Sequence, residues 1–479
     1  LKPPADQISS NQLFLYYYLM EDEQEVVLTD QHGESLSIWE YKTDQVIYVK
    51  ALLTIATEEE LLNIDLTKAY VLINDIEIDT LTNSIDANDV SGFTGVIDGQ
   101  GYQLIIRRQE VSLFNRNNGE IRNLHIVVTS HYWTTRLYDA GFASHNDGLI
   151  KNVSFEARIL SNSLGIAFAG IVGNNKGLIE EASSIIRIDE SFKTGVSIGG
   201  ITYENAGTIN QSYASLSITS QDLREHGTIG GISAHQSIDG TITSSYSSVY
   251  IDAKFGGSSA YYGILNIGGI VGHNKGYISD SYSTGMVRLS LSVTPSRSSI
   301  YARYTPTQAK LSMGGFAGIH QSGIIDRSYS TIDFIDISVI VRAQMLEQGS
   351  QATADVNIGG FIGVSYIDAM VSNSFSTGNI NARLTAEEIY SNGTEPASYE
   401  KLGIYGFSME RASISNVYVI EDQILIIDRA VYSVIVEGEA ISVNNLKSID
   451  WQMEHLFDHD SRDWILNEGQ YPSFDWSHK

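Results

Sequence analysis

Histidines at matching places in successive stretches are the first candidates for chemistry in this sequence. His235, His273 and His320 occupy corresponding positions in three similar stretches, near His145, so stacking those stretches would align their imidazoles. Imidazole nitrogens are common ligands of zinc. Asparagine takes the same position in other stretches, which instead favours a turn position that tolerates both residue types. We prefer the turn interpretation and leave any metal ligand unassigned.

Carboxylates are the second candidates. Asp280 and Asp326 align on neighbouring stretches, where two carboxylates could lie close enough for the paired roles of a glycoside hydrolase. Neutral polar residues fill that place elsewhere, which favours a solvent-facing position. The sequence also lacks the H-E-x-x-H motif of zinc peptidases. We therefore expect no catalytic residues and a protein that is not an enzyme.

Acidic clusters raise the question of calcium. The segment DHDSRD (458–463) brings three aspartates together, but it lacks the glycine and the distal glutamate of a calcium-binding loop. We expect no cofactor, with bound calcium as the one alternative.

Tyrosine, tryptophan and arginine gather in segments of irregular length, at 129–140, 253–266, 289–311, 335–357 and 382–402. These residue types are the usual anchors of binding surfaces, and flat aromatic rows also suit the faces of sugars. The alternative is that the segments fold back as hairpins and pack their rings on the rest of the protein. The candidate ligand-binding residues are Tyr132, Trp133, Tyr138, Tyr261, Tyr262, Tyr301, Arg303, Tyr304, Tyr390 and Tyr399.

A repeat that runs through most of the chain must position these side chains. A small residue anchors each of nine units, and an aliphatic residue follows it two places later every time. Later units add a serine at the fifth place and an aromatic residue at the sixth. The anchors are Gly119, Gly148, Gly177, Gly207, Gly240, Gly276, Gly323, Ala369 and Ala412, and the aromatic residues are Tyr213, Tyr246, Tyr282, Tyr329, Phe375 and Tyr418.

The repeat predicts an all-β fold, a right-handed parallel β-helix (β-solenoid) of about nine coils with capped ends. Each unit is too short to bury its own apolar face, so it must stack on its neighbours. We assign one unit to one coil with three strands, and paired glycines such as Gly268 and Gly269 to a tight corner. Insertions just before each pair would emerge on one side. The serine and aromatic positions should form stacked structural ladders.

Composition narrows the possible partners. The chain has 30 Lys and Arg against 57 Asp and Glu, a formal net charge of −27, and no cysteine. So acidic a surface repels nucleic acid, and the lack of cysteine excludes disulfides and thiolate chemistry. No apolar run approaches the ~18 residues of a membrane span. We expect no nucleic-acid partner, no membrane span and a monomer.

The stretch GGIVGHNKGYISDSYSTGMV (268–287) resembles the GLUG repeat, and the resemblance covers residues 141–418. GLUG repeats occur in large secreted and surface-attached bacterial proteins, including adhesin-like proteins and the non-catalytic part of immunoglobulin-cleaving metallopeptidases. The resemblance implies an extracellular, cell-surface segment that binds a polysaccharide or a cell-surface ligand through its insertion loops. The alternatives are a carbohydrate-active enzyme on a β-helix and a passive spacer of a larger exported protein.

We divide the chain into four parts. These are an N-terminal β-rich cap or small appended unit (1–50), a lead-in helix with the first coils (51–118), the GLUG-like repeats (119–420), and a last coil with a C-terminal cap (421–479). Residues 54–63 predict a short helix with a threonine cap and glutamates in its first turn. Trp451, Trp464 and Trp476 mark the C-terminal cap.

Overall fold

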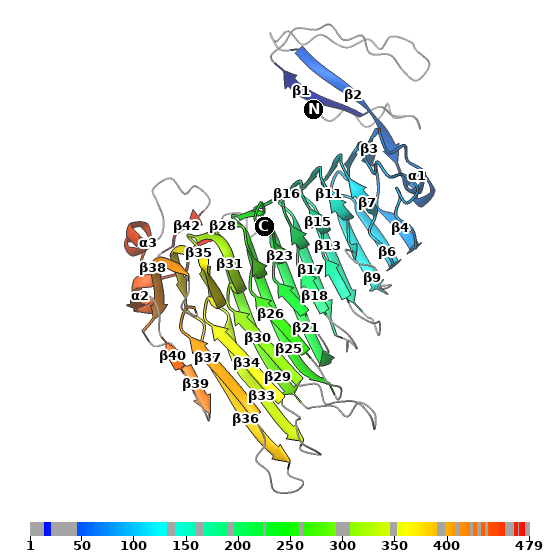
Figure 1. Ribbon diagram of the computed structural model, residues 1–479. Helices are drawn as coiled ribbons and strands as arrows, with labels where there is room; N and C mark the ends of the chain where they lie inside the picture. The colour runs from blue at the N-terminus through cyan, green and yellow to red at the C-terminus, as the bar shows by residue number, and fades with distance from the viewer. Residues whose placement is uncertain are drawn as a thin grey trace, which may run out of the picture.

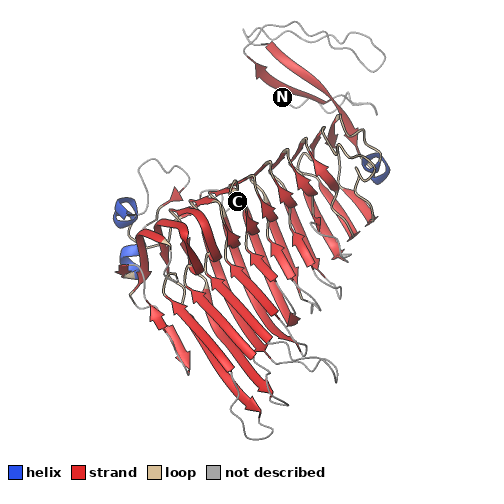
Figure 2. Cartoon of the chain, viewed as in Figure 1, coloured by secondary structure: helices blue, strands red, loops and turns tan. Residues whose placement is uncertain are grey.

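Long parallel sheets dominate the computed structural model (Figure 1). One sheet has 32 strands, a second has nine and a third has two. Among the residues that the structure describes, helices occur only as short segments near the two ends of the stack of strands (Figure 2). The structure describes residues 14–20, 46–131, 139–159, 166–189, 196–223, 227–257, 262–293, 307–344, 352–389, 398–408, 412–421, 425–428, 433–435, 439–455, 464–467 and 469–474. This part of the chain is all-β, as the sequence predicts, and none of its helices is long and apolar enough to span a membrane.

Most repeat units contribute four strands, where we expected three. In one unit, β15 (Val172–Asn175), β16 (Leu178–Glu180) and β17 (Ser183–Ile188) belong to the 32-stranded sheet, and β18 (Val196–Gly199) belongs to the nine-stranded sheet. The fourth strand lies in the segment of variable length, so its short apolar run was hidden among insertions.

Equivalent strands of successive units pair in parallel, which builds the stack. The other first strands are β7 (Phe114–Asn117), β11 (Ala143–Asn146), β19 (Thr202–Asn205), β23 (Ser233–Gln236), β27 (Val271–Asn274), β31 (Ala317–Asp326) and β35 (Ile362–Ser376), of which the last two run on into the second position. The other second strands are β8 (Glu120–Arg122), β12 (Leu149–Lys151), β20 (Thr208–Asn210), β24 (Thr241–Thr243), β28 (Tyr277–Ser279) and β38 (Ser413–Ile420).

The third and fourth strands follow the same rule. The other third strands are β9 (His125–His131), β13 (Ser154–Ile159), β21 (Tyr213–Leu223), β25 (Tyr246–Gly257), β29 (Tyr282–Val293), β32 (Tyr329–Ser330) with β33 (Asp333–Gln344), β36 (Ile380–Ile389) and β39 (Leu425–Asp428). The other fourth strands are β10 (Asp139–Ala140), β14 (Ile166–Ala169), β22 (Gly227–Gly230), β26 (Tyr262–Gly268), β30 (Thr307–Gly314), β34 (Ala352–Gly359), β37 (Ser398–Tyr405) and β40 (Ser433–Ile435).

The insertions lengthen the third and fourth strands. Third strands grow from 6 residues in β17 to 12 in β25, β29 and β33. The outgoing strand β25 pairs with β29, and the returning strand β26 pairs with β30, so the described parts of these insertions extend the two stacked sheets. The lengthened strands reach out together along one edge of the stack (Figure 1).

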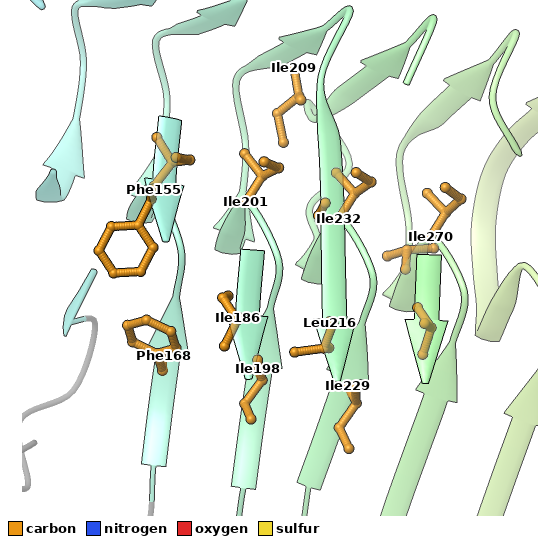
Figure 3. Close-up of a cluster of buried hydrophobic side chains, with 14 of the residues drawn as sticks. Phe155, Phe168, Ile186, Ile198, Ile201, Ile209, Leu216, Ile229, Ile232 and Ile270 are labelled. Carbon is orange, nitrogen blue, oxygen red and sulfur yellow. The ribbon is translucent and has the colours of Figure 1, made fainter. Parts of the chain in front are cut away.

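Columns of aliphatic and aromatic side chains fill the interior. The residue two places after each anchor is buried in eight units, from Ile121 to Val371, whereas Ile414 in the last unit is 38% exposed. Side chains from the first, third and fourth strands of neighbouring units complete this core (Figure 3). Each fully buried aliphatic side chain stabilises the fold by about 1.5–3 kcal/mol.

Paired glycines form the corner between the fourth strand and the next first strand. A Cβ atom on Gly200 would lie 2.0 Å from the carbonyl oxygen of Gly231 in the following unit. A Cβ atom on Gly199 would lie 1.7 Å from the carbonyl oxygen of Thr202. Only glycine permits these backbones to approach so closely, as predicted from the sequence.

The N-terminal end carries a short helix and extra strands. The helix α1 (Glu58–Leu62) begins with a capping box between Thr57 and Glu60, and its Leu61 is buried in the core. The lead-in strands are β3 (Ala69–Leu72), β4 (Ile76–Leu81), β5 (Val96–Asp98) and β6 (Gln103–Gln109). Before them, β1 (Phe14–Met20) pairs antiparallel with β2 (Val46–Ile55), which continues in parallel onto β3.

The C-terminal segment (443–474) packs on the side of the stack as well as its end. It follows β41 (Glu439–Ile441) and contains α2 (Val443–Leu446), α3 (Ile449–His455), β42 (Trp464–Ile465) and β43 (Ser473–Phe474). Its rings contact the aromatic column, defined as Tyr213, Tyr246, Tyr282, Tyr329, Phe375 and Tyr418. Trp451 meets Tyr418, whereas Phe474 reaches back to Tyr246. Trp476 lies outside the described residues.

Candidate functional site

The predicted ligand-binding residues on the insertions fall almost entirely outside the described residues. Tyr262 begins β26 and Tyr399 lies in β37, where the backbone alone is described. The acidic segment 458–463 is also outside the described residues. These assignments stay predictions. The undescribed candidates are Tyr132, Trp133, Tyr138, Tyr261, Tyr301, Arg303, Tyr304 and Tyr390.

A groove lies where the fourth strands β26, β30 and β34 meet the first strands β31 and β35. It has a volume of about 380 Å³. Alternation along each fourth strand points one set of side chains, such as Leu311 and Met313, into the core and leaves the other set for the groove. We call it the corner groove, and its lining residues are Ile264, Asn266, Lys310, Ser312, Ile319, Asp355, Asn357, Val364, Ser365 and Tyr366.

Amide side chains line the inner part of the corner groove. Asn266, Ser312 and Asn357 stand in register on three successive strands, and the two asparagines are only 7% and 5% exposed. Within the described part of the chain, the Oδ1 atoms of both asparagines have no hydrogen-bond partner. An unpaired buried acceptor costs about 1–3 kcal/mol. Both oxygen atoms are themselves buried, so a ligand in the groove reaches them only if the amide groups rotate.

Apolar and charged groups form the outer part of the corner groove. Ile264, Lys310 and Asp355 share the next outward register, with one charge of each sign on neighbouring strands. Ile264 and Tyr366 are each 42% exposed, which leaves an aliphatic and an aromatic surface open to a ligand. The groove thus combines hydrogen-bond acceptors, a cation, an anion and an apolar wall.

Sequence analysis missed the corner groove because its residues come from the fourth strands and the first strands of different units. Residues 264–266 and 364–366 are separated by about two units, and the fourth strands were assigned to loops. The signal that could have revealed these fourth strands is the alternation of buried and exposed residues, because Leu265 and Ile267 are buried while Ile264 is exposed.

A second hollow of about 240 Å³ surrounds two of the predicted histidines. His235 and His273 are paired in register on β23 and β27, and Glu204 precedes them on β19. Burial lowers the pKa of His235 to about 4, with help from the neighbouring His273 and Lys275. Burial also lowers the pKa of His273. We call this the histidine hollow, and it is lined by Tyr203, Glu204, His235, Gln236, Ser237, His273 and Lys275.

His320 does not belong to this row, which corrects the alignment made from the sequence. Its register partners are Asn274 and Ser365, and His273 instead pairs with Ile319. His320 is fully buried, its Nδ1 lies 3.1 Å from Asn274 Nδ2, and its Nε2 lies 3.1 Å from the carbonyl oxygen of Met370. Burial lowers its pKa to about 4.

Asp280 and Asp326 are not aligned either, so the proposed carboxylate pair is wrong. Asp326 pairs with Ser279, one position before Asp280. Arg327 of the following unit binds both oxygens of Asp280 at 2.7 and 2.8 Å and also binds Asp326. The hydrogen bonds that Arg327 donates to Asp280 raise the pKa of the guanidinium above its usual value. Both carboxylates are thus held by one guanidinium.

The serine positions form a hydrogen-bonded ladder, as expected. Each hydroxyl donates to the carbonyl two residues earlier and accepts from the backbone N–H of the serine in the preceding unit. For example, Ser245 Oγ donates to Thr243 O at 2.7 Å and accepts from Ser212 N at 3.1 Å. These hydroxyls therefore link neighbouring units of the stack.

The aromatic positions also form a ladder, as expected. Neighbouring rings are stacked with centroids 4.4 Å apart for Tyr213 and Tyr246 and 4.9 Å apart for Tyr282 and Tyr329. The C-terminal segment covers the middle of the column, where Trp464 and Phe474 contact Tyr282. The hydroxyl of Tyr329 donates to the carbonyl oxygen of Pro472.

Comparison with known proteins adds no family assignment. No family model matches the chain, and no curated protein matches it. A solved structure from Bacteroides ovatus, described as a putative immunoglobulin A1 protease, is 13% identical, with 89% of this chain and 93% of that chain covered and a TM-score of 0.25. A TM-score this low supports no argument about this chain. The resemblance to GLUG repeats therefore stays a prediction.

Proposed function

We propose that the chain is a right-handed parallel β-helix that serves as a non-catalytic binding segment of an exported bacterial protein. We further propose that its ligand is a polysaccharide and that the corner groove holds it. The observation that carries this proposal is the open corner groove, in which the polar side chains of Asn266, Ser312 and Asn357 stand in register beside the exposed ring of Tyr366.

Sugars match the chemistry of the corner groove. A sugar ring presents hydroxyl donors along its edge and carbon-bound hydrogens on its face. The hydroxyl groups suit the polar side chains of Asn266, Ser312 and Asn357, and the apolar face suits the exposed ring of Tyr366. The groove crosses successive strands about 4.8 Å apart, so it offers repeated positions to a repeating ligand.

The environment of the carboxylates favours binding over catalysis. A glycoside hydrolase needs two carboxyl groups on either side of a sugar bond, with one of them protonated. Asp280 and Asp326 are instead bound to Arg327, and Asp355 accepts a hydrogen bond from Asn357 at 3.1 Å. The proposal that the chain is not an enzyme rests on this pairing.

The test is affinity measurement with cellulose, chitin, xylan and peptidoglycan. We expect wild-type protein to bind at least one of them, and Tyr366→Ala to weaken binding about tenfold, equivalent to about 1.4 kcal/mol. Asn357→Leu, which keeps the number of side-chain heavy atoms but removes the amide group, should weaken binding to a similar degree.

Tyr250→Ala is the matched control. Tyr250 is 39% exposed on β25, close to the 42% of Tyr366, but it does not line the corner groove. Its loss should leave affinity unchanged. Binding that survives Tyr366→Ala and Asn357→Leu would move the site to the insertion segments. If the wild type binds none of the four polysaccharides, the spacer role replaces the binding role.

A further inference from the structure

The two imidazoles of the histidine hollow face each other across neighbouring units. The ring centroids of His235 and His273 are 6.2 Å apart with planes inclined by 64°, and Tyr203 packs edge-on against His235 at 5.2 Å. Two imidazoles that share one zinc ion through bonds of about 2.0–2.1 Å have centroids at most about 6 Å apart. The observed spacing is slightly beyond that limit, so a side-chain rotation must bring the rings closer for both to bind one ion.

The hydrogen bonding of His273 prepares it to act as a ligand. Its Nε2 atom lies 2.8 Å from Oε1 of Gln321, which is an acceptor, so Nε2 carries the hydrogen and Nδ1 keeps its lone pair. Metal-binding histidines characteristically donate their second N–H to such an oxygen, which fixes the tautomer and the ring orientation. Gln321 thus holds His273 in the form that binds a cation.

His235 is also in the form that a metal requires. No hydrogen-bond partner contacts its ring nitrogens within the described residues, although the ring is largely buried. Burial lowers the pKa of both histidines, so both are neutral near pH 7 and need not lose a proton to bind a cation.

The charges around the hollow are balanced. Glu204 stands next to His235 in register and accepts hydrogen bonds from Asn174 Nδ2 at 3.3 Å and Ser237 Oγ at 3.1 Å. Lys275 lines the same hollow and opposes a cation. The carboxylate of Glu204 offsets the ammonium group of Lys275, so the two imidazoles decide the affinity.

We propose that His235 and His273 together bind one divalent transition-metal ion, with zinc as the best match, and that water completes its coordination. The described part of the chain contains no group of three His, Asp or Glu side chains placed to hold an ion, so this is a site with two protein ligands. Imidazole ligands favour zinc, copper and nickel over calcium or magnesium. This site is independent of the corner groove and of the proposed sugar ligand.

Calorimetric titration of the full chain with zinc chloride tests the proposal. We expect the wild type to bind one ion that both His235→Ala and His273→Ala abolish. Gln321→Ala, which removes the partner of His273 Nε2, should weaken binding about 10-fold, the usual effect of losing such a partner. Zinc should also raise the melting temperature of the wild type, because a ligand of the folded state stabilises it.

His145→Ala is the matched control. His145 lies in the same row on β11, but its register neighbours are Arg116 and Asn174, so no second imidazole faces it. This variant should bind zinc as the wild type does. Melting of each variant without metal shows whether it is folded. Equal zinc binding by wild type and folded His235→Ala would overturn the proposal, as would the absence of zinc binding by the wild type.

Discussion

Polar side chains that enter the interior of the stack bind to the equivalent side chain of the next unit. Asn117 Nδ2 donates to Asn146 Oδ1 at 2.7 Å, and Asn146 donates in the same way to Asn175 at 2.8 Å. The column continues through Asn205, and His320 takes the place of an asparagine near its end. A buried amide without such a partner would cost about 1–3 kcal/mol, so the column is stable only while each unit supplies a donor and an acceptor.

His320 should therefore make stability depend on pH. Above pH 6.5 the imidazole is neutral in both folded and unfolded protein, and its full contribution is present. Between about 6.5 and about 4 the unfolded chain binds a proton that the folded chain does not, so stability falls by up to ~3 kcal/mol as the pH is lowered. We expect His320→Asn to remove this part of the pH dependence in urea unfolding.

The control is a comparison, between variants, of the slope of unfolding free energy against pH. The packing that His320→Asn loses lowers stability equally at every pH. A change in slope therefore reports only the lost titration of the imidazole. His145→Asn, a change in an outward-facing row, should keep the wild-type slope. Parallel curves for wild type and His320→Asn between pH 6.5 and 4 would contradict the assignment.

The position of His320 shows what sequence spacing can resolve and what it cannot. The serine and aromatic ladders were predicted because they follow the anchors at fixed distances. The stretch before Gly323 has one more residue than the stretch before Gly276, so counting back from Gly323 placed His320 beside His273. A shift of one residue in a strand exchanges the inward and outward faces, which is why this histidine was assigned to the wrong row.

At the scale of the element, a single left-handed residue ends the second strand in every unit. These residues have φ between 44° and 54°, and none is glycine. Asparagine tolerates this conformation better than most residues, and the asparagines at neighbouring positions also bind each other, with Asn152 Nδ2 2.7 Å from Asn123 Oδ1. The column is Asn123, Asn152, Glu181, Gln211, Ser244, Asp280, Arg327, Asn373 and Asn416.

Glu181→Asn should therefore stabilise the protein. The change relieves a strained glutamate at φ 54° and extends the pair formed by Asn123 and Asn152. The ion pair that it removes, with Lys151 at 3.4 Å, is exposed and contributes little, and Lys151 keeps its bond to Glu180. We expect the free energy of unfolding to rise by about 0.5–1 kcal/mol in denaturant titration.

Glu181→Gln distinguishes loss of the charge from relief of backbone strain as the cause of the predicted gain in stability. It removes the same charge but keeps a long side chain with no preference for the left-handed region. We expect it to be neutral. A gain as large as that of Glu181→Asn would attribute the effect to charge and not to backbone conformation.

The fourth strand is the element that sequence analysis did not find, and the corner groove was missed with it. The run GVSIGG (195–200) is short and follows a segment of changing length, so nothing separates it from a loop until the strands are paired. Its outward residues also differ from unit to unit, as in Ile264, Lys310 and Asp355. The side chains that line such a groove do not repeat from unit to unit, so the sequence shows no period there.

At the scale of the whole molecule, the stack carries a formal net charge of −27. Its ion pairs are mostly exposed or half-buried, as with Arg107 and Asp79 at the N-terminal end. Like charges on neighbouring units lie only a few strands apart, so repulsion along the stack opposes folding. The stacking itself was predictable, because the aliphatic residue after each anchor is buried from Ile121 to Val371.

Added salt should therefore raise the melting temperature. Increasing sodium chloride from about 20 mM to about 500 mM shortens the screening length to a few ångströms and weakens this repulsion. Potassium chloride should have the same effect, since screening does not depend on which monovalent cation is used. A melting temperature that falls as either salt is added would show that attractive ion pairs outweigh the repulsion.

The C-terminal segment has a mechanical consequence. Its aromatic residues touch five successive rings of the aromatic column, from Trp451 on Tyr418 to Phe474 on Tyr246. A force that pulls the ends of the stack apart must break the hydrogen bonds between units and also slide this segment along the rings. The C-terminal segment spans only the C-terminal half of the stack. Under tension we therefore expect the units before Tyr213 to separate first and the units after Tyr246 to separate last.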